Sequence, residues 1–133
     1  MIAAVADTHT AIWYLSAELT LSNKARFFIE DVATRGDQIG FSTISGIESI
    51  YLVEKGRIPN QSLQLVLDAL AGSNGLFREI AIDGSVARVL SQVPRNQVPD
   101  LPDRIIAATA VLMNVPLISR DRRIVASSLH TIW

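Results

Sequence analysis

The apolar positions of the chain occur as short continuous runs and as longer segments with helical spacing. Residues 2–6 are all apolar, and the segment after them carries Ile12, Trp13 and Leu15. A short run of this kind is typical of a strand buried on both faces, and the segment that follows has the spacing of a helix. The first charged residue, Asp7, therefore falls at the junction of a predicted strand and a predicted helix.

Turn and capping residues divide the rest of the chain into further elements. Ser22 is placed to begin a helix that Gly36 ends, and Asp83 is placed to cap another. The other predicted helices are 43–55, 61–70 and 101–113, with a short one within 120–128, and the other predicted strands are 39–42, 76–82, 116–119 and 130–133. Helix 101–113 is apolar nearly all round, so we expect it to be deeply buried.

Strands and helices alternate along the chain, which predicts an α/β protein. Parallel neighbours in a sheet need crossover connections, and helices of this length supply them. With 133 residues, of which 49% are hydrophobic, the chain has the size of a single domain with a substantial core. We therefore expect one three-layer α/β/α domain over residues 1–133, with functional residues at the carboxyl ends of its strands.

The composition limits the chemistry that is available. There is no cysteine, which excludes disulfides and thiolate metal sites and favours a reducing compartment such as the cytoplasm. The first apolar run is too short for a membrane span and lacks the basic flank of a signal peptide. The formal net charge is -1, so a nucleic acid would have to be held by a local basic patch.

Three aspartates follow predicted strands or begin a helix. Asp7 follows the first strand, Asp121 follows the fourth, and Asp103 lies in the first turn of the long apolar helix. Each also has a purely structural explanation. Asp7 can cap a helix, and Asp121 can stabilise a turn or pair with a neighbouring arginine. Asp100 and Asp103 can act as the cap and the first-turn acid of one helix.

Glu48 is harder to explain by local structure. With Ile44, Ile47 and Tyr51 it shares one face of helix 43–55, and we expect that face to point toward the sheet. Unpaired buried carboxylates are rare, because removing a charge from water is costly. Glu48 is therefore the strongest sequence sign of a functional acid.

A cluster of such acids needs a compensating positive charge. Two carboxylates about 4 Å apart repel by about 4 kcal/mol at an effective dielectric constant of about 20. With no cysteine and only two histidines, the available ligands are oxygens, which favour Mg²⁺ or Mn²⁺. Such ions hold a phosphate oxygen, generate hydroxide from water and stabilise a leaving oxygen, so we expect phosphodiester hydrolysis.

Five segments of the chain, taken in order, resemble a known family. They are ADTHTAIWYL at 6–15, STISGIES at 42–49, DRIIAATA at 103–110, LISRD at 117–121 and HTIW at 130–133. Each segment is a weak signal alone, but together they span essentially the whole chain. On these segments the chain resembles a PIN-domain ribonuclease, and more narrowly a VapC-type toxin of a bacterial toxin–antitoxin pair.

The resemblance implies a parallel sheet of four to five strands flanked by helices, and a magnesium-dependent endonuclease activity on RNA. The four acidic positions of the family, which are catalytic and hold the metal, match Asp7, Glu48, Asp103 and Asp121. Ser119 and Thr8 match supporting hydroxyl positions. The resemblance further implies a homodimer and a cognate antitoxin whose tail covers the acidic groove.

Residues near the acids, and the helices over 43–70, add further expectations. Arg104, Arg120 and Arg122 can form a local positive rim that contacts RNA phosphates, and the alternative is a solvated charged face without a ligand. We expect His9 to be a turn or packing residue and Trp13 to belong to the core or to an interface. We expect much of the antitoxin groove to come from apolar residues in excess of one core face, namely Ile50, Leu52, Leu63, Val66 and Leu67.

Other small α/β proteins also carry acids at strand ends. A phosphoacceptor signalling domain needs a lysine after its last strand, where this chain has arginines. A haloacid-dehalogenase phosphatase needs a second aspartate at the position of His9. A degenerate module that keeps the fold but only binds a partner stays open as an alternative, although all four acids are present.

Overall fold

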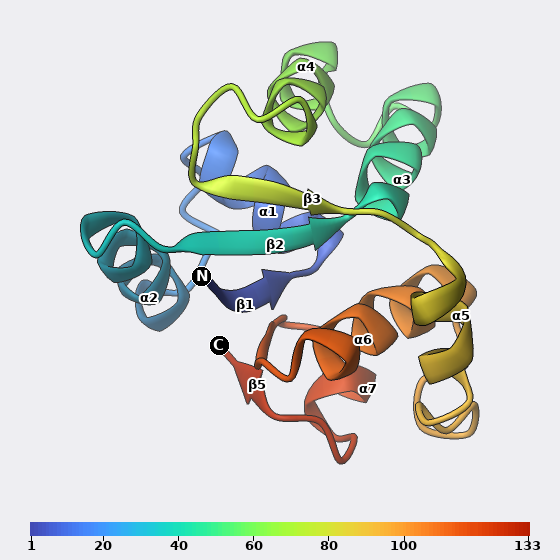
Figure 1. Cartoon of the computed structure of the whole chain (residues 1–133). Coiled ribbons are helices and arrows are strands. Elements are labelled where there is room, and N and C mark those ends of the chain that lie inside the picture. Colours follow the sequence, from blue (N-terminus) through green and yellow to red (C-terminus); the bar gives the residue numbers. More distant parts are fainter.

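The computed structural model describes residues 1–133, and at its centre all neighbouring strands of one five-stranded sheet are parallel (Figure 1). The strands, in chain order, are β1 (Ile2–Ala6), β2 (Gln38–Ser42), β3 (Phe77–Ile80), β4 (Leu117–Ile118) and β5 (Thr131–Ile132). Their order across the sheet is β3-β2-β1-β4-β5. The predicted parallel sheet of four to five strands is confirmed.

Seven helices connect and flank the strands. They are α1 (Thr8–Leu15), α2 (Asn23–Thr34), α3 (Thr43–Glu54), α4 (Asn60–Leu70), α5 (Gly84–Leu90), α6 (Leu101–Met113) and α7 (Arg122–Val125). The elements predicted from the sequence are all present, with ends that differ by a few residues at most. No helix combines the length and the apolar character needed to span a membrane.

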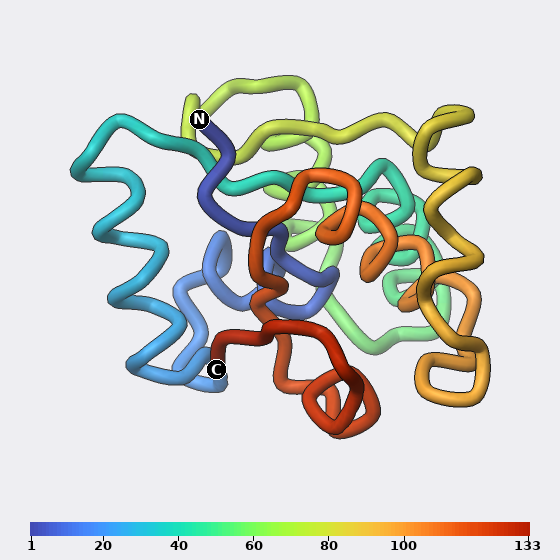
Figure 2. The backbone as a smooth tube through the Cα atoms, turned by 60° about the horizontal axis from the view of Figure 1, so that its bottom comes forward, coloured from blue at the N-terminus to red at the C-terminus, as the bar shows by residue number.

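Two apolar cores, one on each face of the sheet, make the three predicted layers. The first lies under α1, α2 and α4 and includes Ile29 and Val66, and the second lies under α5 and α6. Successive residues of β1 point to opposite faces, so Ala4 and Ala6 belong to the first core and Val5 to the second. Figure 2 shows α2 and α5 on opposite sides of the molecule with β1 between them.

The helices begin and end at the residues that the sequence indicates. Ser22 accepts a hydrogen bond from the backbone N–H of Ala25, and Asp83 caps α5 in the same way. The chain leaves α2 through Gly36, whose φ of 77° lies in the left-handed region that glycine adopts without steric cost. Local capping chemistry therefore explains most of the element boundaries.

The expected orientation of α3 is wrong. Ile47 and Tyr51 do not face the sheet but are 43% and 59% exposed. The buried side of the helix consists instead of small residues, Ser45, Gly46 and Ser49. A Cβ atom added to Gly46 would lie 2.6 Å from Leu70 Cδ1, so the small residues allow α3 to pack closely against α4. This close packing turns the larger apolar side chains outward.

The apolar residues of α3 and α4 named for a groove divide into two groups. Val66 is only 1% exposed and belongs to the first core, and Leu52 packs against the same core. Ile50 and Leu67 are exposed, and Leu63 is partly exposed. The expectation that all five residues exceed the needs of the core is therefore corrected, because α4 uses Val66 to cover the sheet.

Helix α6 is deeply buried only in its middle. Residues 106–110 are buried, whereas Leu101 is exposed at one end and Leu112 near the other. A helix of 13 residues is about 20 Å long, which exceeds the roughly 16 Å of a five-residue strand such as β1. The ends of α6 therefore extend beyond the sheet that covers its middle.

The strand order changes direction at β1. From β1 the chain proceeds to β2 and β3 on one side, and then to β4 and β5 on the other. Where the strand order reverses in this way, the connections after the two adjacent strands run to opposite sides. A crevice then opens at the carboxyl ends of these two strands, which here are β1 and β4. Asp7 directly follows β1 and Ser119 directly follows β4, so both lie at this crevice.

Candidate active site

A cavity of about 410 Å³ lies at the carboxyl edge of the sheet and is strongly acidic. It is lined by five carboxylates and four other side chains, namely Asp7, Glu48, Asp100, Asp103, Asp121, Thr8, His9, Trp13 and Arg120. The four acids singled out in the sequence are thus brought together from parts of the chain more than one hundred residues apart. Arg120 is the only lysine or arginine among the lining residues.

The topology explains why these acids meet. Asp7 and Asp121 come shortly after β1 and β4, and Glu48 lies in the helix that follows β2. Helix α6 leads into β4, so it begins at the carboxyl edge of the sheet and brings Asp103 of its first turn there. Parallel strands place all their carboxyl ends at one edge, which is what collects the four side chains.

Asp7 is both a helix cap and a lining residue of the cavity. Its Oδ1 accepts a hydrogen bond of 2.9 Å from the backbone N–H of Thr10, and the residue is only 8% exposed. Burial raises the pKa of Asp7 above its ordinary value, and hydrogen bonds from Ser119 and Thr10 partly offset this effect. The structural and the functional interpretations of Asp7 are therefore compatible.

Thr8 holds Glu48 in place. The Thr8 hydroxyl donates a hydrogen bond of 2.5 Å to Glu48 Oε1, and its oxygen lies 3.1 Å from Ser45 Oγ. Burial raises the pKa of Glu48, the hydrogen bond from Thr8 lowers it, and the charge of Asp100 raises it again. The contact joins the start of α1 to α3 and fixes the carboxylate at the cavity.

Asp103 is a strongly perturbed carboxyl group of the cavity. Its pKa is raised to about 7, first by burial and then by the negative charges of Asp100, Asp121, Glu48 and Asp7. Asp100 caps α6 by accepting from the N–H of Asp103, as predicted. Asp100 also lines the cavity, and its negative charge raises the pKa of Asp103 and of Glu48. The sequence left open whether Asp100 belongs to the acidic site. The D-x-x-D spacing at the start of the helix was the feature that suggested it.

Ser119 connects two of the acids from a fully buried position. Its Oγ accepts a hydrogen bond of 3.0 Å from the backbone N–H of Asp121, and its hydroxyl bonds to the carboxylate of Asp7. Asp121 Oδ1 in turn caps α7 by accepting from the N–H groups of Arg123 and Ile124. Asp121 forms no salt bridge with the arginines beside it, so the suggested pairing is not observed, and the residue acts as a helix cap, which the sequence analysis did not suggest.

The three arginines expected at the rim have different surroundings. Arg120 lines the cavity, and Arg122 lines a depression next to it together with Arg120 and Asp121. Arg104 donates instead to the backbone oxygens of Val93 and Leu90 at the end of α5. Successive helical residues point about 100° apart, so the neighbour of Asp103 faces another side of α6. Arg104 therefore does not line the cavity, and its contact with RNA stays a prediction.

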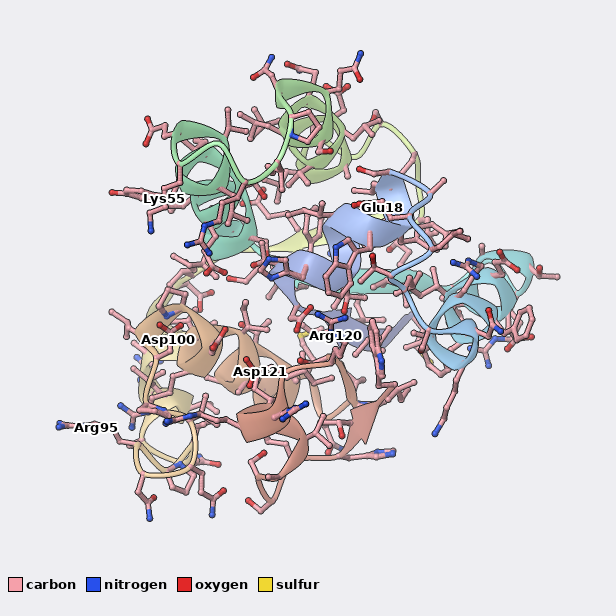
Figure 3. All side chains as sticks on the ribbon, turned by 180° about the vertical axis from the view of Figure 1, so that it is seen from behind. Glu18, Lys55, Arg95, Asp100, Arg120 and Asp121 are labelled. Carbon is pink, nitrogen blue, oxygen red and sulfur yellow. The ribbon has the colours of Figure 1, made fainter.

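His9, Trp13 and Arg120 form a stack at the mouth of the cavity. The ring of His9 lies 5.4 Å from that of Trp13, and Arg120 Cζ lies 4.8 Å from the centroid of the Trp13 ring. His9 packs on an aromatic ring as expected, but it also lines the cavity, which its sequence position beside Asp7 suggested. In Figure 3, Arg120 and Asp121 lie near the centre of the face, whereas Arg95 lies at its edge.

The chemistry of the donors suits a hard divalent cation. All five acids offer carboxylate oxygens, and the negative charges of four of them raise the pKa of the fifth, Asp103. No three acidic or histidine side chains form a closed group that could hold a metal ion together. Mg²⁺ is commonly held by one or two carboxylates while it keeps several waters, so an open arrangement of this kind is adequate for it.

A family model described as the PIN domain matches residues 4–127. Ribonuclease VapC22 of Mycobacterium tuberculosis is 31% identical over 140 aligned positions, which cover 100% of each chain.

Solved structures with the same fold include two from toxin–antitoxin systems. A toxin–antitoxin complex from Klebsiella pneumoniae matches with a TM-score of 0.68 and 25% identity, over 98% of this chain and 97% of the other. VapBC2 from Rickettsia felis, bound to a DNA fragment from its promoter, matches with a TM-score of 0.70 over the same shares, and its 17% identity makes it evidence for the fold alone. With the family model covering nearly the whole chain and a ribonuclease aligned along its full length, this protein belongs to the PIN-domain family.

Proposed function

We propose that the protein is a Mg²⁺-dependent endoribonuclease, which hydrolyses phosphodiester bonds of RNA. The observation that carries the proposal is the gathering of five carboxylates around one cavity whose only lysine or arginine, Arg120, forms no ion pair with them. Negative charge at this density is stable at neutral pH when a cation compensates it. The relation to Ribonuclease VapC22 supports RNA as the substrate.

Asp7, Glu48, Asp103 and Asp121 are the acids that would hold the ion, one or two of them directly and the others through water, and Mg²⁺ or Mn²⁺ is suitable. When bound there, such an ion polarises the phosphodiester, activates water and stabilises the leaving oxygen. Thr8 orients Glu48 through a hydrogen bond, and Ser119 fixes the position of Asp7 relative to the start of α7. These hydroxyls act by fixing the acids, because the positions of carboxylates around an ion decide its affinity.

The reaction adds water across a P–O bond. The oxygen of water joins phosphorus, one of its protons goes to a base, and a proton goes to the oxygen that leaves the chain. The pKa of Asp103 is raised to about 7 in the metal-free protein, and a bound cation would lower it. Asp103 would therefore serve as an ionised ligand during the reaction, and the two protons would be exchanged with solvent water.

The activity is tested by incubating the purified protein with end-labelled single-stranded RNA in Mg²⁺ and in EDTA. We expect cleavage in Mg²⁺ and a loss of at least about 100-fold in EDTA, because the ion supplies several kcal/mol of transition-state stabilisation. Added Mn²⁺ should restore the rate. Cleavage that persists in EDTA would contradict metal dependence, and RNA that stays intact under all conditions would favour the degenerate binding module.

We also propose that the protein is the toxin of a toxin–antitoxin pair, that it forms a homodimer, and that a cognate antitoxin inhibits it. The relation to Ribonuclease VapC22 and the 25% identical toxin–antitoxin complex support this proposal. Helices α3 and α4 present large apolar side chains to solvent, namely Ile47, Ile50, Tyr51, Leu65 and Leu67. Contiguous apolar surface on a soluble domain marks a protein contact. An antitoxin tail that also reaches the acidic cavity would need a cation such as arginine there.

Glutamate substitutions on α3 test where the antitoxin binds. Ile50→Glu and Tyr51→Glu should each reduce the amount of antitoxin that co-purifies by at least about tenfold, because a charge in an apolar interface loses its water. RNA cleavage by the free variants should be unchanged. Phe27→Glu is the matched control, since Phe27 is an exposed large apolar residue on α2, outside α3 and α4. Equal antitoxin recovery from all variants would place the contact elsewhere.

A further inference from the structure

The acidic cavity repels the phosphates of an RNA substrate. Each phosphate of RNA carries a negative charge, and the cavity already holds five carboxylates. A single divalent ion does not neutralise the combined negative charge of the carboxylates and the phosphates. The phosphates on either side of the cleaved bond therefore need another cation. Arg120 is the only lysine or arginine that lines the cavity, which makes its surroundings decisive.

The guanidinium of Arg120 is held by stacking rather than by ion pairing. Its Cζ lies 4.8 Å from the centroid of the Trp13 ring, and no salt bridge of the structure includes it. Other arginines of the chain are engaged differently. Arg35 pairs with Asp31 and Asp37, and Arg104 donates to two backbone carbonyls. A cation held over an aromatic face keeps its N–H groups available at its edge.

Trp13 is itself fixed from more than one side. Its ring lies 5.4 Å from the ring of His9 and 5.8 Å from that of Trp133, the last residue of the chain. It packs against the first core and lines the cavity at the same time. The ring is therefore a rigid support at the cavity mouth, and the conformational entropy that Arg120 would lose on binding an anion is already partly lost.

Arg120 borders a second hollow next to the cavity. It lines this neighbouring depression with Asp121 and Arg122, whereas Asp7, Glu48 and Asp103 line only the cavity. Arg120 thus lies between the two hollows, where its charge is available to a phosphate adjacent to the one being cleaved.

We propose that Arg120 is the phosphate-binding residue for the RNA backbone next to the cleaved bond, and that Trp13 is the positioning residue that holds it. The planar guanidinium offers two parallel N–H donors to one phosphate. The assignment rests on the proposed ribonuclease function, and it adds the residue that makes the acidic site tolerate its substrate. It predicts a contact with the backbone and not with a base, and hence no dependence on sequence.

Binding of RNA measures this contact separately from cleavage. The probe is a fluorescein-labelled single-stranded RNA of mixed sequence, and its Kd is measured by anisotropy in Mg²⁺ at several KCl concentrations. The Asp7→Asn background prevents cleavage during the titration. Arg120→Ala should raise the Kd about tenfold and reduce the slope of log Kd against log salt by about 0.7, the value for one phosphate of a single strand. Arg95→Ala, which removes the same charge at the edge seen in Figure 3, should change neither.

A double-mutant cycle tests the role of Trp13. Trp13→Leu should raise the Kd by about threefold in the parent and have no further effect when Arg120 is already alanine, because it acts through Arg120. Trp13→Phe keeps an aromatic face and should recover most of the affinity. Thermal unfolding of each variant identifies loss of folding. Additive effects of the two substitutions would mean that Trp13 contacts RNA itself and would overturn the positioning role.

The assignment of Arg120 and the ribonuclease function are refuted by different results. An equal Kd and an equal salt slope for Arg120→Ala and its parent would overturn the assignment of Arg120, even if the wild-type protein cleaves RNA. Absence of cleavage by the wild type would refute the ribonuclease function, while a Kd that depends on Arg120 would still support the phosphate contact.

Discussion

Replacing Asp7 with asparagine is expected to reduce the rate of RNA cleavage by at least about 1000-fold, which corresponds to about 4 kcal/mol of lost transition-state stabilisation. The substitution removes a negative charge from the centre of the proposed metal site. It keeps the helix cap, because the amide oxygen of asparagine can still accept the N–H of Thr10. The loss of activity should therefore occur without loss of folding.

Stability measurements separate the two roles of Asp7. Since burial raises the pKa of Asp7, the ionised form is less stable in the folded protein than in water. The Asp7→Asn variant should accordingly unfold at an equal or higher urea concentration than the parent in EDTA. Asp31→Asn on α2, an exposed position, is the control and should retain full activity. A variant at Asp7 that cleaves RNA at the parental rate would refute the assignment of the site.

The second large effect is the pH dependence that arises from Asp103. Its pKa is about 7 in the folded protein and 3.8 in an unperturbed carboxyl group. Between these values the folded protein binds more protons than the unfolded chain, so stability in EDTA should fall as pH rises through this window. Below about pH 4 both states are protonated, and above about pH 7 both are ionised, so the dependence should level off at each end.

Metal binding should show the opposite trend. A cation competes with the proton on Asp103, so its apparent affinity should rise by up to about tenfold per pH unit between about pH 5 and pH 7. Calorimetric titration of the metal-free protein with Mg²⁺ or Mn²⁺ at several pH values measures this change. Asp103→Asn should reduce the pH dependence of stability, to which the raised pKa values of Asp7 and Glu48 also contribute, and should lower the metal affinity. Asp83→Asn, at the exposed cap of α5, should alter neither. A flat stability profile from pH 4 to pH 7 would contradict the raised pKa.

The sequence determined the elements of this protein and the identity of its acids. The ends of the elements are marked by local features, namely apolar runs, capping residues such as Ser22 and breakers such as Gly36. These features can be recognised in the sequence without knowledge of the fold. The alternation of strands and helices was sufficient for a parallel sheet. Acids after strand ends could then be assigned to one edge, because all carboxyl ends of a parallel sheet lie there.

Only the tertiary structure decided which way the helices turn. The face of α3 with Ile47 and Tyr51 satisfied the apolar pattern, but the small residue Gly46 lets the opposite face approach α4. Similarly, Arg104 follows Asp103 in the sequence but binds carbonyls at the end of α5. Which side of a helix is buried depends on what packs against it, and this partner is not encoded in the helix's own pattern.

The tertiary structure also decided the charges of the site. The pKa of Asp103 depends on four carboxylates from separate elements, and the position of Arg120 depends on the ring of Trp13. Burial and distance determine such interactions, and both are set only when distant segments meet. The sequence therefore identifies the acidic and basic residues of the site. The pKa values of the acids and the contact of Arg120 with Trp13 follow only from the folded chain.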